Sequence, residues 1–136
     1  MLMKVVVLAI AAFAALPCAA QAAADRIALV IGNSAYQKAT ILTNPVNDAR
    51  GLAKALRSLS FDVQERPDLG HAAMKEAIGR FLKASSQARI ALLFFAGHGM
   101  QVFGRNYLTP VDAHLASADT IDAEAMRVGT TRSCSG

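Results

Sequence analysis

The chain contains three histidines and two cysteines, the side chains most suited to acid–base or nucleophilic chemistry. His98 stands out because it lies between Gly97 and Gly99, directly after the apolar run Ala88–Ala96. Glycines let the backbone turn sharply and leave a neighbouring side chain uncovered. A histidine placed in this way can titrate near neutral pH and exchange a proton with a substrate. The spacing alone also fits a turn histidine without a role, so both interpretations stay open.

The other candidate residues have weaker patterns. His71 follows Gly70 at an expected helix start and His114 lies in a polar loop, so we interpret both as surface residues. The three histidines are not spaced as a metal site on one element, and the acidic residues form no calcium loop. The segment 32–36 (GNSAY) lacks the GxGxxG spacing of a dinucleotide-binding loop. We therefore expect no metal and no cofactor.

The segments around these residues alternate between the two-residue hydrophobic period of a strand and the 3.6-residue period of a helix. We expect strands over 26–31, 61–65 and 88–96, and amphipathic helices from Asn44-Pro45 to Leu59 and around 73–83. The run 88–96 (ARIALLFFA) is apolar apart from Arg89 near its start, as in a strand buried on both faces. Strands that alternate with helices predict a parallel sheet covered on both faces, with functional groups at the carboxyl ends of its strands.

The pattern changes after Gly97. Residues 100–102 and 106–108 flank Phe103-Gly104-Arg105 and predict a small hairpin. Residues 120–128 are typical of the first turns of another helix, with Thr120 or Asp119 as its cap. Residues 129–136 are small, polar and aperiodic, and we interpret them as a disordered tail or the relic of a frameshift or early stop.

The N-terminus has the pattern of an export signal. Lys4 precedes the uncharged run 5–15, Pro17 interrupts it, and small residues at 20–24 fit a signal-peptidase site. We expect residues 1–24 to be a cleaved signal peptide and the protein to be exported, to the periplasm or the medium. Residues 5–24 are also long enough for an uncleaved membrane anchor. Contact with a membrane is expected only in that case.

Length and charge limit the remaining function classes. The 136 residues suit one domain. The net charge of +4 comes from scattered basic residues rather than a patch, which argues against nucleic-acid binding.

The two cysteines are expected to have different fates. We expect Cys18 to be removed with the signal peptide, and Cys134 to remain as a free thiol near the C-terminus, open to oxidation or intermolecular pairing.

A series of motifs in chain order resembles the caspase-like cysteine peptidases, in particular the metacaspases and their bacterial homologues. The resemblance runs from Arg26 to about Val128. The matching segments are RIALVIGN at 26–33, Tyr36, Leu42, NDA at 47–49, ALLFFAGHG at 91–99 and YLTPVD at 107–112.

The resemblance implies a caspase-like three-layer α/β/α sandwich with a mostly parallel sheet. It implies that His98 activates a catalytic cysteine and that the Gly99 N–H helps to bind the oxyanion. It also places Asp48 in the primary specificity pocket, which would select polypeptides with Arg or Lys at the cleaved bond. Without the family, Asp48 fits a first-turn helix acid favoured by the helix dipole. Ala96 departs from many metacaspases, which carry a hydroxyl residue there.

The family places its cysteine about 50 residues beyond the histidine, after a further apolar strand. Cys134 comes too early and follows no apolar strand, so we expect 25–128 to be a partial caspase-like domain whose sheet is incomplete at the C-terminal end. We expect no peptide hydrolysis from this chain alone and an apolar sheet edge beside the histidine strand. A non-catalytic module that pairs with a homologous caspase-like chain is the alternative, and an unrelated small-molecule-binding domain is a third.

Overall fold

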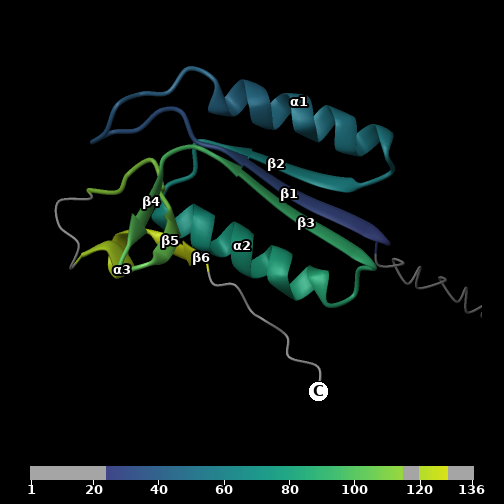
Figure 1. The fold of residues 1–136 in the computed structure, drawn as a ribbon. Helices are drawn as coiled ribbons and strands as arrows, with labels where there is room; N and C mark the ends of the chain where they lie inside the picture. The colour runs from purple at the N-terminus through teal and green to yellow at the C-terminus, as the bar shows by residue number, and fades with distance from the viewer. Residues whose placement is uncertain (1–23, 115–119, 129–136) are drawn as a thin grey trace, which may run out of the picture.

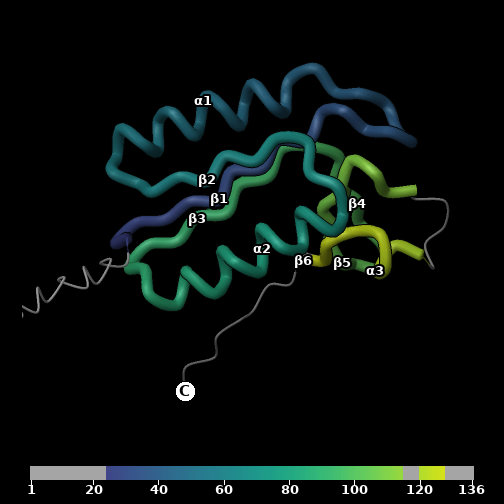
Figure 2. The backbone as a smooth tube through the Cα atoms, turned by 180° about the vertical axis from the view of Figure 1, so that it is seen from behind, coloured from purple at the N-terminus to yellow at the C-terminus, as the bar shows by residue number. Residues whose placement is uncertain are grey.

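The computed structural model describes residues 24–114 and 120–128, which form a main sheet, two long helices and a small second sheet (Figures 1 and 2). Each expected element of the first half is present, with ends shifted by a few residues. In chain order the elements are β1 (Arg26–Gly32), α1 (Pro45–Ser58), β2 (Asp62–Pro67), α2 (His71–Ser85), β3 (Ile90–Ala96), β4 (Gly99–Val102), β5 (Arg105–Leu108), α3 (Ile121–Glu124) and β6 (Met126–Val128).

The main sheet is parallel and has the order β2-β1-β3. Helix α1 covers one face and α2 covers the other, so the chain forms three layers (Figure 1). Parallel neighbours need crossover connections, and the two helices provide them. This arrangement confirms the predicted α/β/α architecture.

The core lies on both faces of β1, the central strand. Ala28 and Val30 pack with Ala49, Ala53 and Leu56 of α1. Leu29 and Ile31 point to the opposite face and pack with Met74 and Phe81 of α2. This alternation is the period of a β-strand, and full burial of one such large side chain stabilises the fold by about 1.5–3 kcal/mol.

The prediction that the strand before His98 is buried on both faces is wrong. β3 is an edge strand of the described sheet, and Ile90 and Leu93 are 41% and 38% exposed. Leu92 and Phe94 still pack against the α1 side of the core and Phe95 against the α2 side. An apolar composition indicates that a strand is packed against other segments, but it does not show which segments these are. Among the described residues, β3 has no strand partner on the side away from β1.

The second sheet is antiparallel and has the order β4-β5-β6. The predicted hairpin is confirmed: Val102 pairs with Arg105, and the turn between them has φ of 49° at Phe103 and 73° at Gly104. Two positive φ values in a two-residue loop are the type I′ geometry that suits a hairpin.

The predicted helix over 120–128 is correct only for its first turn. Thr120 is the N-cap, α3 ends at Glu124, and Ala125 is extended. Met126–Val128 then pairs with β5 as β6. The free edge of β5 offers backbone partners to this segment, and Ile121 and Ala125 are buried against Tyr107. Tertiary pairing therefore overrides the local helical pattern.

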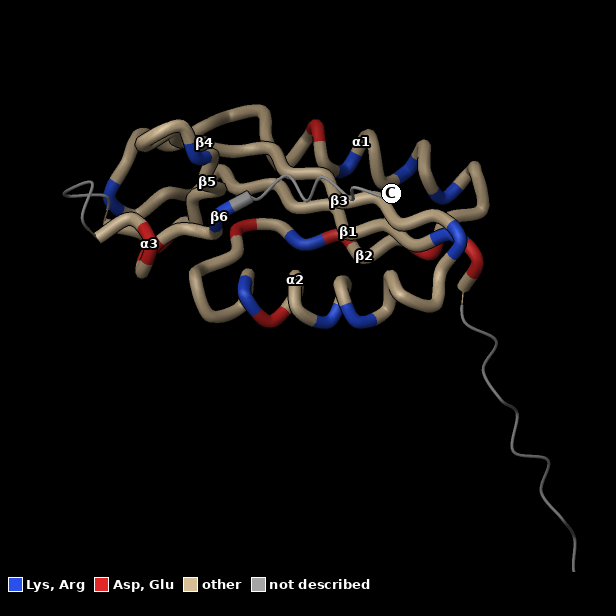
Figure 3. The backbone as a smooth tube through the Cα atoms, turned by 60° about the horizontal axis from the view of Figure 1, so that its bottom comes forward, with Lys and Arg blue, Asp and Glu red and all other residues tan. Residues whose placement is uncertain are grey.

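The expected signal peptide and C-terminal tail, with Cys18 and Cys134, lie outside the described residues. Within 24–114 and 120–128, no helix has the length and apolar content needed to cross a membrane. Lys and Arg occur along both helices, with acidic residues among them (Figure 3).

Candidate active site

The candidate site lies at the carboxyl edge of the parallel sheet, where β1 and β3 end side by side. The Asn33 N–H donates to the Ala96 carbonyl at 2.8 Å, which extends the pairing of the two strands by one residue. The chain then diverges into the loop 33–44 after β1 and the turn 97–98 after β3. Residues far apart in the sequence meet here because parallel strands place their ends at one edge.

The ring of His98 is oriented by the loop after β1. Its Nε2 atom lies 2.8 Å from the Thr40 carbonyl oxygen. A carbonyl oxygen only accepts hydrogen bonds, so Nε2 carries the proton in this contact. In the neutral ring the lone pair then lies on Nδ1, and this nitrogen is the one able to accept a proton from a nucleophile.

Tyr36 holds the backbone of His98. The buried Tyr36 hydroxyl accepts the His98 N–H at 2.7 Å and donates to the Thr109 carbonyl at 3.2 Å. The two rings also lie against each other, with centroids 4.5 Å apart and planes tilted by 59°. Burial raises the pKa of Tyr36 above 10.0, an effect that the hydrogen bond from the His98 backbone opposes. The phenol is therefore neutral at physiological pH and acts as a fixed hydrogen-bonding group.

Close packing explains why residue 97 is a glycine, but it does not explain why residue 99 is one. A Cβ atom at Gly97 would overlap the Tyr36 hydroxyl and would come within 2.8 Å of the Phe95 ring. A Cβ atom at Gly99 would meet only the Tyr107 carbonyl oxygen at an ordinary 3.7 Å. Gly99 begins β4, and its suggested role as an oxyanion donor stays a prediction.

The side chain of Asn33 is fully buried next to the site. It connects the loop after β1 to the loops that contain Leu69 and Thr109. Its amide nitrogen donates to the carbonyls of Leu69 and Thr109, both at 3.2 Å, and its amide oxygen accepts the Leu69 N–H at 2.9 Å. The Thr109 N–H in turn donates to the His98 carbonyl at 3.1 Å. The sequence motifs contain Asn33 and Tyr36, but sequence reasoning gave neither a function.

Two acidic residues fix the loops around Asn33. The Asp68 carboxylate accepts the N–H groups of Ser34 at 2.7 Å and Ala35 at 2.9 Å. The Asp112 carboxylate accepts the His71 N–H at 2.8 Å at the start of α2, where helical N–H groups lack internal partners. These contacts explain why acids occur at the two positions without giving them a catalytic role.

Residues 25–129 match the family model described as the caspase domain. The chain belongs to this family. The human mucosa-associated lymphoid tissue lymphoma translocation protein 1 is 38% identical over 91 residues, which are 67% of this chain and 11% of that protein. Its mouse homolog has the same identity and coverage. The chain therefore spans about a tenth of the length of these curated relatives.

Asp48 of this caspase domain lies in the first turn of α1, at the same sheet edge as His98. Its side chain is exposed, and among the described residues its carboxylate has no hydrogen-bond or ion-pair partner. The structure therefore leaves Asp48 available to a ligand, and its role in specificity stays a prediction.

Both cysteines of the chain fall outside the described residues, so the site as described contains His98 without a thiol. The described residues also contain no group of three or more His, Cys, Asp or Glu side chains arranged to hold a metal ion. His71 and His114 line a separate cavity with Asp112 and Glu124.

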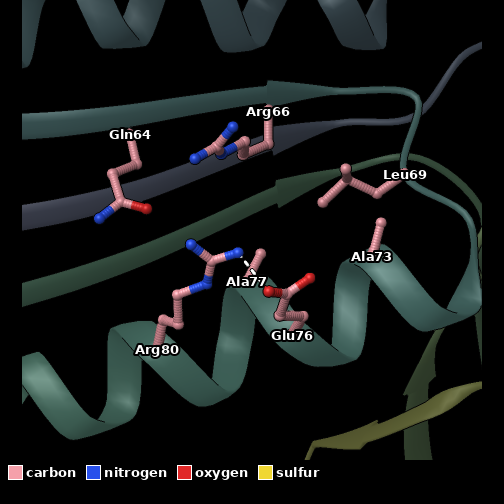
Figure 4. A pocket seen from close by; sticks show the side chains of 7 residues that line it. All are labelled: Gln64, Arg66, Leu69, Ala73, Glu76, Ala77 and Arg80. Carbon is pink, nitrogen blue, oxygen red and sulfur yellow. Dashed lines mark hydrogen bonds and ion pairs between the residues drawn. The ribbon is translucent and has the colours of Figure 1, made fainter.

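A further hollow lies between β2 and α2 (Figure 4). Its charged side chains are Arg66, Glu76 and Arg80, and Glu76 and Arg80 form an ion pair. Its lining contains no His, Cys, Ser or Thr side chain. We therefore locate the candidate site at His98 and not in this hollow.

Proposed function

We propose that this caspase domain supplies the histidine part of a cysteine endopeptidase site that cleaves polypeptides after Arg or Lys. The observation that carries the proposal is the double restraint on His98. Tyr36 holds its backbone and the Thr40 carbonyl holds its ring, and Nδ1 has no hydrogen-bond partner among the described residues. A base that is fixed in this way matches the geometry that an activated thiol requires.

The chemistry at this site would run in two proton transfers. Nδ1 takes the proton of a cysteine thiol, and the thiolate attacks the scissile carbonyl carbon. The imidazolium then returns the proton to the amine that leaves, and a backbone N–H at Gly99 stabilises the oxyanion. Water hydrolyses the acyl-enzyme and regenerates the thiol.

Asp48 supports the preference for basic residues. It is an exposed carboxylate without a partner among the described residues, and it lies at the same edge of the sheet as His98. A guanidinium group can bind a carboxylate through two parallel hydrogen bonds. A substrate with Arg or Lys at the cleaved bond would therefore gain affinity from Asp48.

We propose further that this chain does not hydrolyse peptides by itself, because no acyl-enzyme can form without a nucleophile. Cys134 lies outside the described residues and follows no apolar strand in the sequence. The test is stopped-flow mixing of the purified chain with a chromogenic ester of a peptide that ends in Arg. The proposal expects no burst of leaving group. A burst that disappears in His98→Ala but persists in the matched control His114→Ala would contradict it.

A non-catalytic binding module is the second candidate. The apolar strand β3 favours it, because β3 has no partner on its outer side among the described strands. Such a module would add its edge strand to the sheet of a homologous caspase-like chain. This function requires a stable fold, so failure of the purified chain to unfold cooperatively in urea would exclude it.

We also propose that the protein is exported through residues 1–24, on the basis of their charge and apolar pattern. Mass spectrometry of the protein recovered from the producing cells tests this proposal. A mature N-terminus between residues 20 and 26 supports it, and a protein that retains Met1 contradicts cleavage.

A further inference from the structure

The hollow between β2 and α2 exists because small and polar side chains line the space where these two elements meet (Figure 4). Ala73 and Ala77 of α2 line this hollow, whereas the larger Met74 and Phe81 of the same helix pack with β1. Among the described residues, the apolar cluster under α2 contains no residue of β2. The helix therefore covers β1 closely and leaves a hollow of about 110 Å³ beside β2.

Two guanidinium groups from different elements line this hollow. Arg66 lies on β2 and Arg80 lies on α2, and the amide of Gln64 is a further polar group in the lining. Figure 4 shows both arginine side chains directed into the space between the strand and the helix. Alternate residues of a strand share a face, so Gln64 and Arg66 both face α2. The hollow therefore presents N–H donors from two elements.

The positive charge of the hollow is only partly neutralised. Glu76 forms an ion pair with Arg80 one turn away on α2. Of the acids near Arg66 in the sequence, Glu65 forms an ion pair with α1 at 3.2 Å, and Asp68 accepts backbone N–H groups of the loop after β1. Arg66 itself has no hydrogen-bond or ion-pair partner among the described residues. One positive charge in the hollow is therefore left without a counter-charge.

We propose that the hollow binds a carboxylate group of a polypeptide between the guanidinium groups of Arg66 and Arg80. A guanidinium group can bind a carboxylate through two parallel hydrogen bonds. Arg80 donates one hydrogen bond to Glu76, and a guanidinium group has five N–H donors in total. Arg80 therefore keeps donors for a ligand while Glu76 holds its side chain in place.

The position of Glu76 favours a planar, singly charged anion. The Glu76 carboxylate lines the same hollow and already faces Arg80. A carboxylate ligand is planar and can direct both of its oxygens at the two arginines. A tetrahedral phosphate would turn at least one charged oxygen towards Glu76, and like charges in one site repel each other. A single negative charge also balances the charge of Arg66.

The size of the hollow indicates one residue of a polypeptide rather than a whole small molecule. Pockets that enclose a small-molecule ligand measure about 300–1,000 Å³, and this hollow measures about 110 Å³. It has room for a carboxylate and a short stem, for which Leu69 and Ala73 offer apolar contact. The carboxylate comes from an acidic side chain or from the C-terminus of a chain. We expect a dissociation constant of about 1–10 mM for one blocked residue, because few atoms make contact.

NMR titration of the isotope-labelled full chain tests the site with ligands of known structure. N-acetylglutamic acid α-amide supplies a side-chain carboxylate, and N-acetylalanine supplies a C-terminal carboxylate. We expect at least one of them to shift the backbone amide signals around the hollow, and the neutral N-acetylglutamine amide to shift none of them. Tighter binding of the glutamate ligand would support an acidic side chain as the source, and tighter binding of N-acetylalanine would support a chain terminus.

Three variants test the roles of the charges. Arg66→Gln should weaken carboxylate binding at least about tenfold. The matched control Arg50→Gln removes the same charge from an exposed position on α1 and should bind as the parent does. Inorganic phosphate should bind to the parent more weakly than the carboxylates do, and Glu76→Gln should reduce this difference.

Three results would overturn the proposal: no shifts around the hollow with either carboxylate, equal affinity of Arg66→Gln and the parent, or tighter binding of inorganic phosphate than of both carboxylates by the parent. The inference goes beyond the proposed function and does not use His98. A failure of this titration would therefore leave the peptidase proposal standing, and a failure of the peptidase proposal would not affect the hollow.

Discussion

Replacement of Asn33 by alanine removes the side chain that joins the loops beneath His98. The variant loses two donated hydrogen bonds of 3.2 Å and one accepted bond of 2.9 Å. Two of the three former partners keep another hydrogen bond: the Leu69 carbonyl still accepts the Val111 N–H, and the Thr109 carbonyl still accepts the Tyr36 hydroxyl. The Leu69 N–H is the group left without its partner.

The expected loss of stability follows from this pattern. An unsatisfied buried N–H costs about 1–3 kcal/mol, and each lost hydrogen bond whose partner is otherwise satisfied contributes about 0.5–1.5 kcal/mol. Because Leu69 is only partly buried, we expect the free energy of unfolding to fall by about 3 kcal/mol. A domain of this size has about 5–15 kcal/mol in total, so the variant should still fold.

Urea unfolding followed by circular dichroism measures this change. The matched control is Asn47→Ala, because Asn47 is exposed and accepts only a long bond of 3.5 Å from Arg50. We expect the control to differ from the parent by less than about 0.5 kcal/mol. A change in Asn33→Ala as small as in the control would refute the conclusion that Asn33 organises the site.

Four further predictions concern the same loops. Tyr36→Phe should speed hydrogen exchange of the His98 amide at least tenfold, because the N–H loses its 2.7 Å acceptor; NMR measures the rate. Gly97→Ala should destabilise the fold by more than about 2 kcal/mol in urea, since its Cβ overlaps the Tyr36 hydroxyl, whereas Gly99→Ala should change it by less than about 1 kcal/mol. Asp112→Ala should cost about 1 kcal/mol through loss of the α2 cap, measured by thermal unfolding. Stability should also fall as the pH rises above 10.0, because the folded state holds the Tyr36 proton more tightly than the unfolded chain does, and Tyr36→Phe should reduce this fall in urea titrations at pH 9–11.

Each of these predictions has a contrary outcome. Equal exchange of the His98 amide in Tyr36→Phe and the parent would show that another group protects it. Equal stability of the Gly97 and Gly99 variants would exclude a steric role for Gly97. An unchanged melting temperature in Asp112→Ala, or an unchanged alkaline slope in Tyr36→Phe, would show that the contact concerned does not stabilise the fold.

The sequence predicts the element order well because the evidence for it is local. The helical spacing after Pro45 and the apolar run of β1 each reflect a period that one segment carries by itself. The Phe103-Gly104 turn is also local, because a two-residue hairpin needs residues that tolerate positive φ. The position of His98 at a strand end follows from these elements and the family motifs.

The features that the sequence does not predict depend on contacts between distant segments. β3 looks more buried than β1 by composition, yet β1 is central because it pairs on both sides. Residues 126–128 continue a helical pattern but pair with β5. The partners of Asn33 and Tyr36 lie more than 30 residues away along the chain, and no local spacing reveals them.

The most direct test of the central claim is affinity labelling of His98 with a peptidyl chloromethyl ketone that ends in Arg. The free Nδ1 lone pair attacks the CH₂Cl carbon and chloride leaves, so the reaction needs no thiol. Mass spectrometry of the Cys18→Ser, Cys134→Ser chain measures the rate at each histidine. The account predicts labelling of His98 at least tenfold faster than with the matched reagent that ends in Glu, and loss of this preference in Asp48→Asn but not in the control Asp62→Asn. Equal labelling of His71, His98 and His114 by both reagents would contradict it.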